Sequence, residues 1–234
     1  MTSSGPELFL DFDGVICNSL DECYVSSFLA HHGGNIPDST EIRSRALFDT
    51  YRPFIRSGGD YVAIQHLVDH GVVITDQIGF DRAAAEIGDS RAMRSSMYRA
   101  RGRLLADAPD YWLSLNRLYP EIRGSLQALS SRHWILTTKE PSYVERILDH
   151  NGIRWPVDRI ICSGSERKLD IIAASVSTRA LLIDDQIAHL RPNPYGTIDV
   201  LLASWGFVRP EWLLQSDVPI LERADLDDAL RPFF

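Results

Sequence analysis

The chain has 234 residues, of which 44% are hydrophobic and 24% are charged, and its formal net charge is -8. This length suits one large domain, or a core domain with a substantial insertion. The acidic balance argues against binding to nucleic acid or to an anionic membrane surface. No apolar run approaches the ~20 residues of a membrane span, and the first residues lack a signal-peptide pattern, so we expect a cytoplasmic protein. The three cysteines have no CxxC spacing, so they indicate neither a zinc site nor a disulfide framework.

The first predicted element is a buried strand over residues 6–13, which carries Asp11 and Asp13 and is followed by Gly14. Because alternate residues of a strand point to the same face, the two carboxylates can converge on one point. Two such acids repel each other unless they share a cation or a proton. The pattern therefore indicates a site for a hard cation such as Mg²⁺, with one acid free to act on a phosphoryl group.

The next hundred residues have a helical pattern throughout and no convincing strand. Glycines and a proline divide this region into expected helices at 20–32, 39–52, 59–70, 80–87, 90–106 and 109–118. We expect His31 and His32 to end the first of them, where a cationic group is favourable. An exposed basic face is expected for five arginines, namely Arg91, Arg94, Arg99, Arg101 and Arg103.

After Pro120 the pattern changes to alternating helices and strands. The expected helices are 121–131, 141–151, 166–177 and about 225–230, and the expected strands are 134–137, 159–162, 180–184 and 197–202, with a short helix after the third of them. Repeated β-α units with short apolar strands imply a parallel sheet covered on both faces. The sequence thus predicts a doubly wound α/β (Rossmann-like) core, residues 1–16 and 120–234, with an inserted all-helical domain, residues 17–119.

Parallel sheets of this kind bind ligands at the carboxyl ends of their strands, and here polar residues gather at that edge. They are Asp11, Asp13, Thr137, Thr138, Lys139, Lys168, Asp184 and Asp185. Lys139 and Lys168 are the only lysines of the chain, and both follow candidate strands. Acid, hydroxyl and lysine side chains, together with Mg²⁺, are the parts that a phosphoryl-transfer site needs. Lys139 is read equally well as a solvated loop lysine or as a neighbour of the phosphate.

The sequence resembles the haloacid dehalogenase-like hydrolase superfamily, in its phosphatase branch with a helical cap. Four motifs carry the resemblance, in the family's order: Asp11-Phe12-Asp13-Gly14-Val15, Ile135-Leu136-Thr137-Thr138-Lys139, Lys168, and Leu182-Ile183-Asp184-Asp185. Tyr119-Pro120-Glu121 and Ser204-Trp205-Gly206 also resemble segments of phosphoglycolate-phosphatase-like members.

The resemblance implies a role for each residue of the site. Asp11 would be the nucleophile that forms an aspartyl-phosphate, and Asp13 would be the general acid for the leaving alcohol and then the base for water. Thr137 and the backbone amide of Thr138 would bind the phosphoryl oxygens. Lys168 would pair with both the nucleophile and the phosphoryl group.

The resemblance also implies a Mg²⁺ site. One oxygen of Asp11, the backbone carbonyl of Asp13 and the carboxylate of Asp185 would be ligands, with Asp184 acting directly or through water. Many relatives have a further acid four residues after the fourth-motif aspartate, where this chain has His189. A histidine supplies no hard oxygen ligand, which would leave more of the supporting role to Asp184.

The function that these residues imply is Mg²⁺-dependent hydrolysis of a small phosphorylated metabolite. A phosphomutase of the same superfamily would share the aspartyl-phosphate and the helical cap, and a non-catalytic phosphate-binding regulatory module is the alternative from another class. A phosphonatase would need a lysine in the cap, and residues 17–118 contain none. In the helical insertion, Arg52 and Arg56 could contact an anionic substrate, with a solvated helix end as the alternative.

Overall fold

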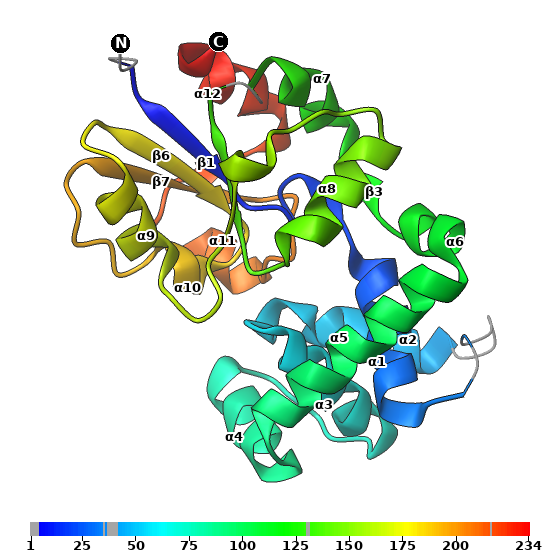
Figure 1. Ribbon diagram of the computed structural model, residues 1–234. Helices are drawn as coiled ribbons and strands as arrows, with labels where there is room; N and C mark the ends of the chain where they lie inside the picture. The colour runs from blue at the N-terminus through cyan, green and yellow to red at the C-terminus, as the bar shows by residue number, and fades with distance from the viewer. Residues whose placement is uncertain (1–4, 35, 37–41, 130–131, 216) are drawn as a thin grey trace. The chain divides into compact units, whose positions relative to one another are not determined.

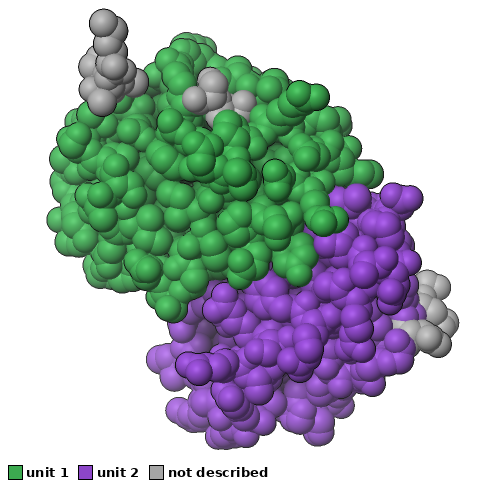
Figure 2. Space-filling view, in the orientation of Figure 1, with its two compact units in different colours: residues 1–18, 117–234 green, residues 19–116 purple. Residues whose placement is uncertain are grey.

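The computed structural model describes residues 5–34, 36, 42–129, 132–215 and 217–234 (Figure 1). The chain divides into two compact units (Figure 2). Residues 1–18 and 117–234 form the first, which we call the core unit, and residues 19–116 form the second, which we call the helical unit. None of the helices in the described residues is long and apolar enough to cross a membrane.

The core unit is built on a six-stranded sheet with the order β5-β4-β1-β6-β7-β8, in which all neighbouring strands are parallel. The strands are β1 (Glu7–Leu10), β4 (Trp134–Thr137), β5 (Ile160–Cys162), β6 (Ala180–Asp184), β7 (Ile198–Ala203) and β8 (Ile220–Leu221). The predicted α/β class with a doubly wound parallel sheet is confirmed. Strand β8 was not predicted, because two apolar residues carry too weak a pattern.

Strand β1 lies at the centre of the sheet, where Leu10 is paired with Ile135 on one side and Ile183 on the other. Its three apolar residues, Leu8, Phe9 and Leu10, are fully buried. A strand that is covered on both faces reads as a continuous apolar run, which is why this element was visible in the sequence. The prediction was wrong at its end, because β1 stops at Leu10 and not at residue 13.

Helices surround the sheet in the core unit (Figure 1). They are α7 (Pro120–Leu129), α8 (Pro141–His150), α9 (Lys168–Ser175), α10 (Ile187–Leu190), α11 (Pro210–Gln215) and α12 (Leu226–Leu230), with 3-10 turns at Val157–Arg159, Arg223–Asp225 and Arg231–Phe233. Leu169 and Ile172 of α9 pack in one apolar cluster with Phe9, Leu136 and Leu182 of the sheet. Helix α11 was not predicted, and the end of the expected helix 121–131 lies outside the described residues.

A short pair of antiparallel strands forms between the two segments of the chain that connect the core unit to the helical unit. Strand β2 (Cys17–Asn18) pairs with β3 (Arg117–Leu118), so that Cys17 lies opposite Leu118. The expected helix 109–118 was therefore too long. It ends at Ser114, and Asn116 Nδ2 donates to the Trp112 carbonyl at 2.9 Å, which covers an acceptor at the helix end.

All regular elements that the structure describes in the helical unit are helical. They are α1 (Leu20–His32), α2 (Ile42–Tyr51), a 3-10 turn (Arg52–Phe54), α3 (Gly58–Asp69), α4 (Gln77–Ile87), α5 (Ser90–Asp107) and α6 (Pro109–Ser114). The first residues of the expected helix 39–52 lie outside the described residues. Helix α3 starts with a capping box, in which Ser57 and Asp60 satisfy each other's backbone amides.

A buried ion pair connects three helices of the helical unit. Glu22 of α1 accepts hydrogen bonds from Arg101 Nε at 2.7 Å and Arg101 Nη2 at 2.9 Å, and from Trp112 Nε1 at 3.0 Å. Ser26 Oγ donates to the same carboxylate at 2.6 Å. Arg101 is buried, so its expected place on an exposed basic face was wrong. Its partner lies 79 residues away in the sequence, which no local pattern indicates.

Candidate active site

The carboxyl ends of β1, β4 and β6 form the edge at which the polar residues meet. The chain runs from β1 to β4 and β5 on one side, and then places β6, β7 and β8 on the other side. Such a reversal leaves a crevice beyond the strand ends, where open α/β sheets bind ligands. The geometry of the core unit therefore matches the edge that the sequence indicated.

Asp11 is the first residue after β1, and its carboxylate is held from two sides. Its backbone amide donates to the Ile183 carbonyl at 2.9 Å, which continues the pairing with β6. Its Oδ1 atom accepts from the Phe12 amide at 2.7 Å and lies 2.9 Å from Lys168 Nζ. Burial raises the pKa of Asp11 to about 6, against the lowering effect of Lys168.

Lys168 connects Asp11 with Asp184 at the end of β6. Its ammonium group lies 2.9 Å from Asp11 Oδ1 and 2.7 Å from Asp184 Oδ2, and the side chain is fully buried. Burial would lower the pKa of Lys168, but the two carboxylates raise it above its usual value. The lysine is therefore charged at neutral pH and balances part of the negative charge of the site.

The carboxylate of Asp184 has a partner on each oxygen. Oδ1 accepts from the Gln186 amide at 2.8 Å, and Oδ2 lies 3.0 Å from His189 Nδ1 in addition to Lys168. Burial disfavours its ionised form, but Lys168 and His189 hold the pKa of Asp184 well below its usual range. His189 thus orients Asp184 in this chain.

Asp13 is paired with the second lysine of the chain. Lys139 Nζ lies 2.9 Å from Asp13 Oδ1, and Lys139 is buried beside the ring of Phe12. This burial excludes the solvated loop lysine that the sequence left open. Because β1 ends at Leu10, Asp11 and Asp13 lie in the turn after the strand, and each is held by its own lysine.

The hydroxyl groups of the second motif lie at the end of the neighbouring strand. Thr137 is the last residue of β4 and is buried, and its Oγ1 accepts from the Lys139 amide at 3.2 Å. Its carbonyl accepts from the Ser163 amide at 2.8 Å, which fixes the strand end. Thr138 follows in a half-buried bend. The backbone after β4 therefore brings a hydroxyl and amides to the edge that holds Asp11.

Asp185 lies against two glycines that the sequence did not assign to the site. A Cβ atom on Gly14 would lie 1.9 Å from Asp185 Oδ2, and one on Gly206 would lie 2.3 Å from Asp185 Cβ. The Phe207 amide donates to Asp185 Oδ2 at 2.6 Å. The signal for Gly206 was its place in Ser204-Trp205-Gly206, which follows the predicted strand 197–202 and was one of the segments that carried the resemblance.

Replacing Gly14 by alanine should disrupt this contact. Gly14 has φ 93°, which an L-residue adopts only with strain, and the new methyl group would overlap the Asp185 carboxylate. We expect a loss of about 1–3 kcal/mol in the free energy of unfolding, measured in urea, with displacement of Asp185. Gly124→Ala is the matched control, because a Cβ there meets nothing within 4 Å and the site is helical. A neutral Gly14→Ala variant would contradict the overlap.

The donor set at this edge suits a hard divalent cation. Ligand atoms of Asp11, Asp184 and His189 lie within 4.8 Å of one another, and Asp185 directly follows Asp184. The positive charge of Lys168 is shared by two carboxylates, so one further cation would balance the acids and favour ionised Asp11. The carboxylate oxygens of this set are ligands that Mg²⁺ prefers, whereas His189 offers only a nitrogen.

The two arginines considered for substrate contact both belong to the helical unit. Arg52 is buried, with its guanidinium 5.3 Å from the centre of the Tyr61 ring, so the solvated helix end is wrong for this residue. Arg56 is exposed and lies 3.2 Å from Asp81 Oδ2. Their contact with a substrate stays a prediction.

Solved structures share this fold over nearly their whole length. A predicted phosphoglycolate phosphatase from Haemophilus somnus is 16% identical with a TM-score of 0.57, covering 98% of this chain and 99% of its own. A HAD family hydrolase from Deinococcus radiodurans, with bound phosphate and sodium, is 15% identical with a TM-score of 0.52, covering 99% and 97%. The Protein Tyrosine Kinase A from Mycobacterium tuberculosis is 19% identical with a TM-score of 0.51, covering 97% and 99%.

These likenesses confirm the fold that the four motifs predicted. No protein-family model matches the sequence, and no curated protein matches it. At these identities the likeness concerns the fold alone, and the same fold carries proteins described as phosphatases and a protein described as a kinase. The activity must therefore be argued from the side chains of this chain.

Proposed function

We propose that this chain is a Mg²⁺-dependent phosphatase that hydrolyses a small phosphorylated metabolite through an aspartyl-phosphate on Asp11. One observation carries the proposal: a buried lysine joins Asp11 to Asp184 at the point where the strand order of the sheet reverses. Burying two acids and a lysine at a strand edge carries a desolvation cost, and such clusters are typical of functional sites. The helical unit is proposed to act as a cap over this site.

In the first step, an oxygen of Asp11 attacks phosphorus in line with the ester oxygen. The bond between phosphorus and the leaving oxygen breaks, and Asp13 gives its proton to that oxygen. Lys168 stays beside Asp11 and neutralises the charge on the phosphoryl oxygens, together with Thr137 and the Thr138 amide. Lys139 holds the carboxyl group of Asp13 in a fixed orientation throughout.

In the second step, Asp13 takes a proton from a water molecule, whose oxygen attacks phosphorus. The bond between phosphorus and the Asp11 oxygen breaks, its electron pair returns to the carboxylate, and inorganic phosphate leaves. Bound Mg²⁺ would neutralise negative charge on the transferring group, and Asp11, the Asp13 carbonyl and Asp185 would hold it, with Asp184 in support.

The proposal predicts hydrolysis of a generic aryl phosphate that depends on Mg²⁺. Turnover should be lost when EDTA removes the divalent cation and should return when Mg²⁺ is added in excess. The reason is that Lys168 alone cannot offset the negative charge of the acids and of the phosphoryl group. The measurement is release of the coloured phenol, followed by a panel of phosphorylated metabolites. Folded protein with Mg²⁺ and no turnover on any of them would favour the non-catalytic phosphate-binding module.

The phosphomutase alternative makes a different prediction in the same assay. A mutase returns the phosphoryl group to an organic acceptor, so it would release little inorganic phosphate. The molar ratio of released inorganic phosphate to consumed substrate distinguishes the phosphatase from the mutase. A ratio near one favours the phosphatase, and a ratio near zero with an isomerised product favours the mutase.

A further inference from the structure

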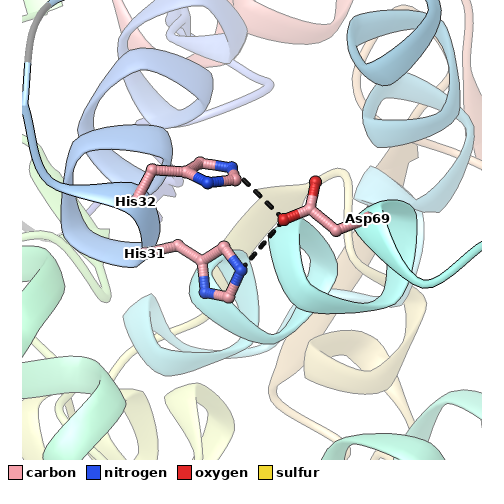
Figure 3. A group of neighbouring side chains, drawn as sticks. All are labelled: His31, His32 and Asp69. Atoms are coloured by element: carbon pink, nitrogen blue, oxygen red, sulfur yellow. Dashed lines mark hydrogen bonds and ion pairs between the residues drawn. The ribbon is translucent and has the colours of Figure 1, made fainter.

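Four of the seven histidines of the chain lie at the ends of two helices in the helical unit. His31 and His32 form the end of α1, and His66 lies in the last turn of α3, with His70 at its C-terminal cap. Asp69, the last residue of α3, lies among them (Figure 3). This cluster has no place in the proposed phosphatase chemistry, which is confined to the core unit.

Three of these side chains point at one position. The Nε2 atoms of His31 and His32 lie 3.1 Å and 3.3 Å from the same Asp69 oxygen, Oδ2 (Figure 3). All three potential ligand atoms lie within 4.8 Å of one another. The side chains are 22%, 34% and 32% exposed, so the position is open to solvent and a metal ion could enter it.

These distances are those of a small tetrahedral metal site. Zinc binds histidine nitrogen and carboxylate oxygen at about 2.0–2.2 Å, which separates tetrahedral ligands by roughly 3.3–3.5 Å. The two nitrogen–oxygen distances, of which the one from His31 is also a hydrogen-bond distance, are close to that separation. Two imidazoles and one carboxylate form a ligand set that borderline-soft ions accept and that Mg²⁺ does not favour.

Two more imidazole rings lie beside the three proposed ligands. The His66 ring lies edge-on to His31 at 5.7 Å and is stacked on His70 at 4.0 Å. His70 Nδ1 lies 2.8 Å from the His66 carbonyl, which holds that ring at the end of α3.

We propose that His31 Nε2, His32 Nε2 and the carboxylate of Asp69 bind one Zn²⁺ ion, with a fourth position left to water. The ion would join the end of α1 to the end of α3. Its role would be to stabilise the helical unit, since all three ligands belong to that unit and both helices also contact α5. The site shares no residue with the acids around Asp11 and does not depend on the proposed phosphatase activity.

The test is a calorimetric titration of Zn²⁺ into protein without a histidine tag. Excess Mg²⁺ is present so that the acidic site of the core unit is occupied by the ion that it prefers. We expect one zinc ion per chain, with affinity reduced more than tenfold in His32→Ala and in Asp69→Asn, since loss of even a supporting group costs about 10–100-fold. His150→Ala is the matched control, an exposed histidine on α8 of the core unit.

Two further readouts separate ligation from a structural effect of the substitutions. Co²⁺ in place of Zn²⁺ should give the strong visible absorption of a tetrahedral site in wild type and in His150→Ala. This absorption should be absent in His32→Ala. Zinc should raise the unfolding temperature of wild type but not of His32→Ala, whose circular dichroism without zinc confirms folding. Absence of zinc binding in wild type, or equal binding in both ligand variants, would overturn the proposal. Equal binding would assign the ion to the core unit.

Discussion

Asp11→Asn should reduce the turnover of an aryl phosphate by about 10⁴-fold or more, while the protein stays folded. An amide oxygen is too weak a nucleophile to form the acyl-phosphate bond, and the substitution also removes a charged oxygen that would bind the proposed Mg²⁺. The fold should tolerate the change, because Lys168 keeps its contact with Asp184 and the neutral amide is easier to bury than the carboxylate. Initial rates with saturating Mg²⁺ give the measurement.

The matched control for this variant is Asp199→Asn. Asp199 is on β7 of the same sheet but is exposed and paired only with Arg179 among the contacts described. Its loss should leave both turnover and the unfolding temperature nearly unchanged, as expected for an exposed ion pair. If Asp11→Asn kept a tenth or more of the wild-type rate, covalent catalysis by Asp11 would be wrong, even with Mg²⁺ dependence intact.

Arg101→Met should lower the free energy of unfolding of the helical unit by about 3–5 kcal/mol. The substitution leaves the Glu22 carboxylate buried and without the guanidinium that donates two of its hydrogen bonds. Trp112 and Ser26 would remain, but neither carries a positive charge. Urea unfolding gives the size of the effect, and hydrogen exchange of the α1 and α5 amides localises it to the helical unit.

Arg103→Met serves as the control for Arg101→Met. It lies on the same helix and loses the same charge, but its side chain is exposed, so we expect a change within about ±0.5 kcal/mol. The double variant Glu22→Met with Arg101→Met should recover much of the loss, since no unpaired charge remains in the interior. If Arg101→Met were as stable as Arg103→Met, the buried pair of Glu22 and Arg101 would contribute little to stability.

The sequence alone determined the class of the fold and the edge of the sheet at which the polar residues gather. Both depend on local signals: short apolar strands, helical spacing between them, and polar residues directly after the strands. Asp11, Lys168 and Asp184 could be named because each lies at the junction of two elements, where parallel strands bring their ends together. The scarcity of lysine in the composition also distinguished Lys139 and Lys168 from the many arginines of the chain.

The end of β1 shows where such local signals fail. The sequence predicted that the strand continues through Phe12 to Asp13, but β1 ends at Leu10. The side chains of Asp11 and Asp13 are therefore placed by the segment after the strand and by two separate lysines. The burial of Lys139 depends on Asp13, which is distant from it in the chain. Local pattern carries no information on such pairs.

The tertiary structure alone decided the contacts between distant helices. The sequence grouped Arg101 with four other arginines on an expected exposed face, but packing places Glu22 of α1 beside it. His31 and His32 have the pattern of ordinary helix-ending residues, but α3 brings Asp69 to them. The physical reason is the same in both cases. Helical periodicity fixes which face of a helix a residue occupies, but the partner on that face depends on how the helices pack, and only the folded chain determines this.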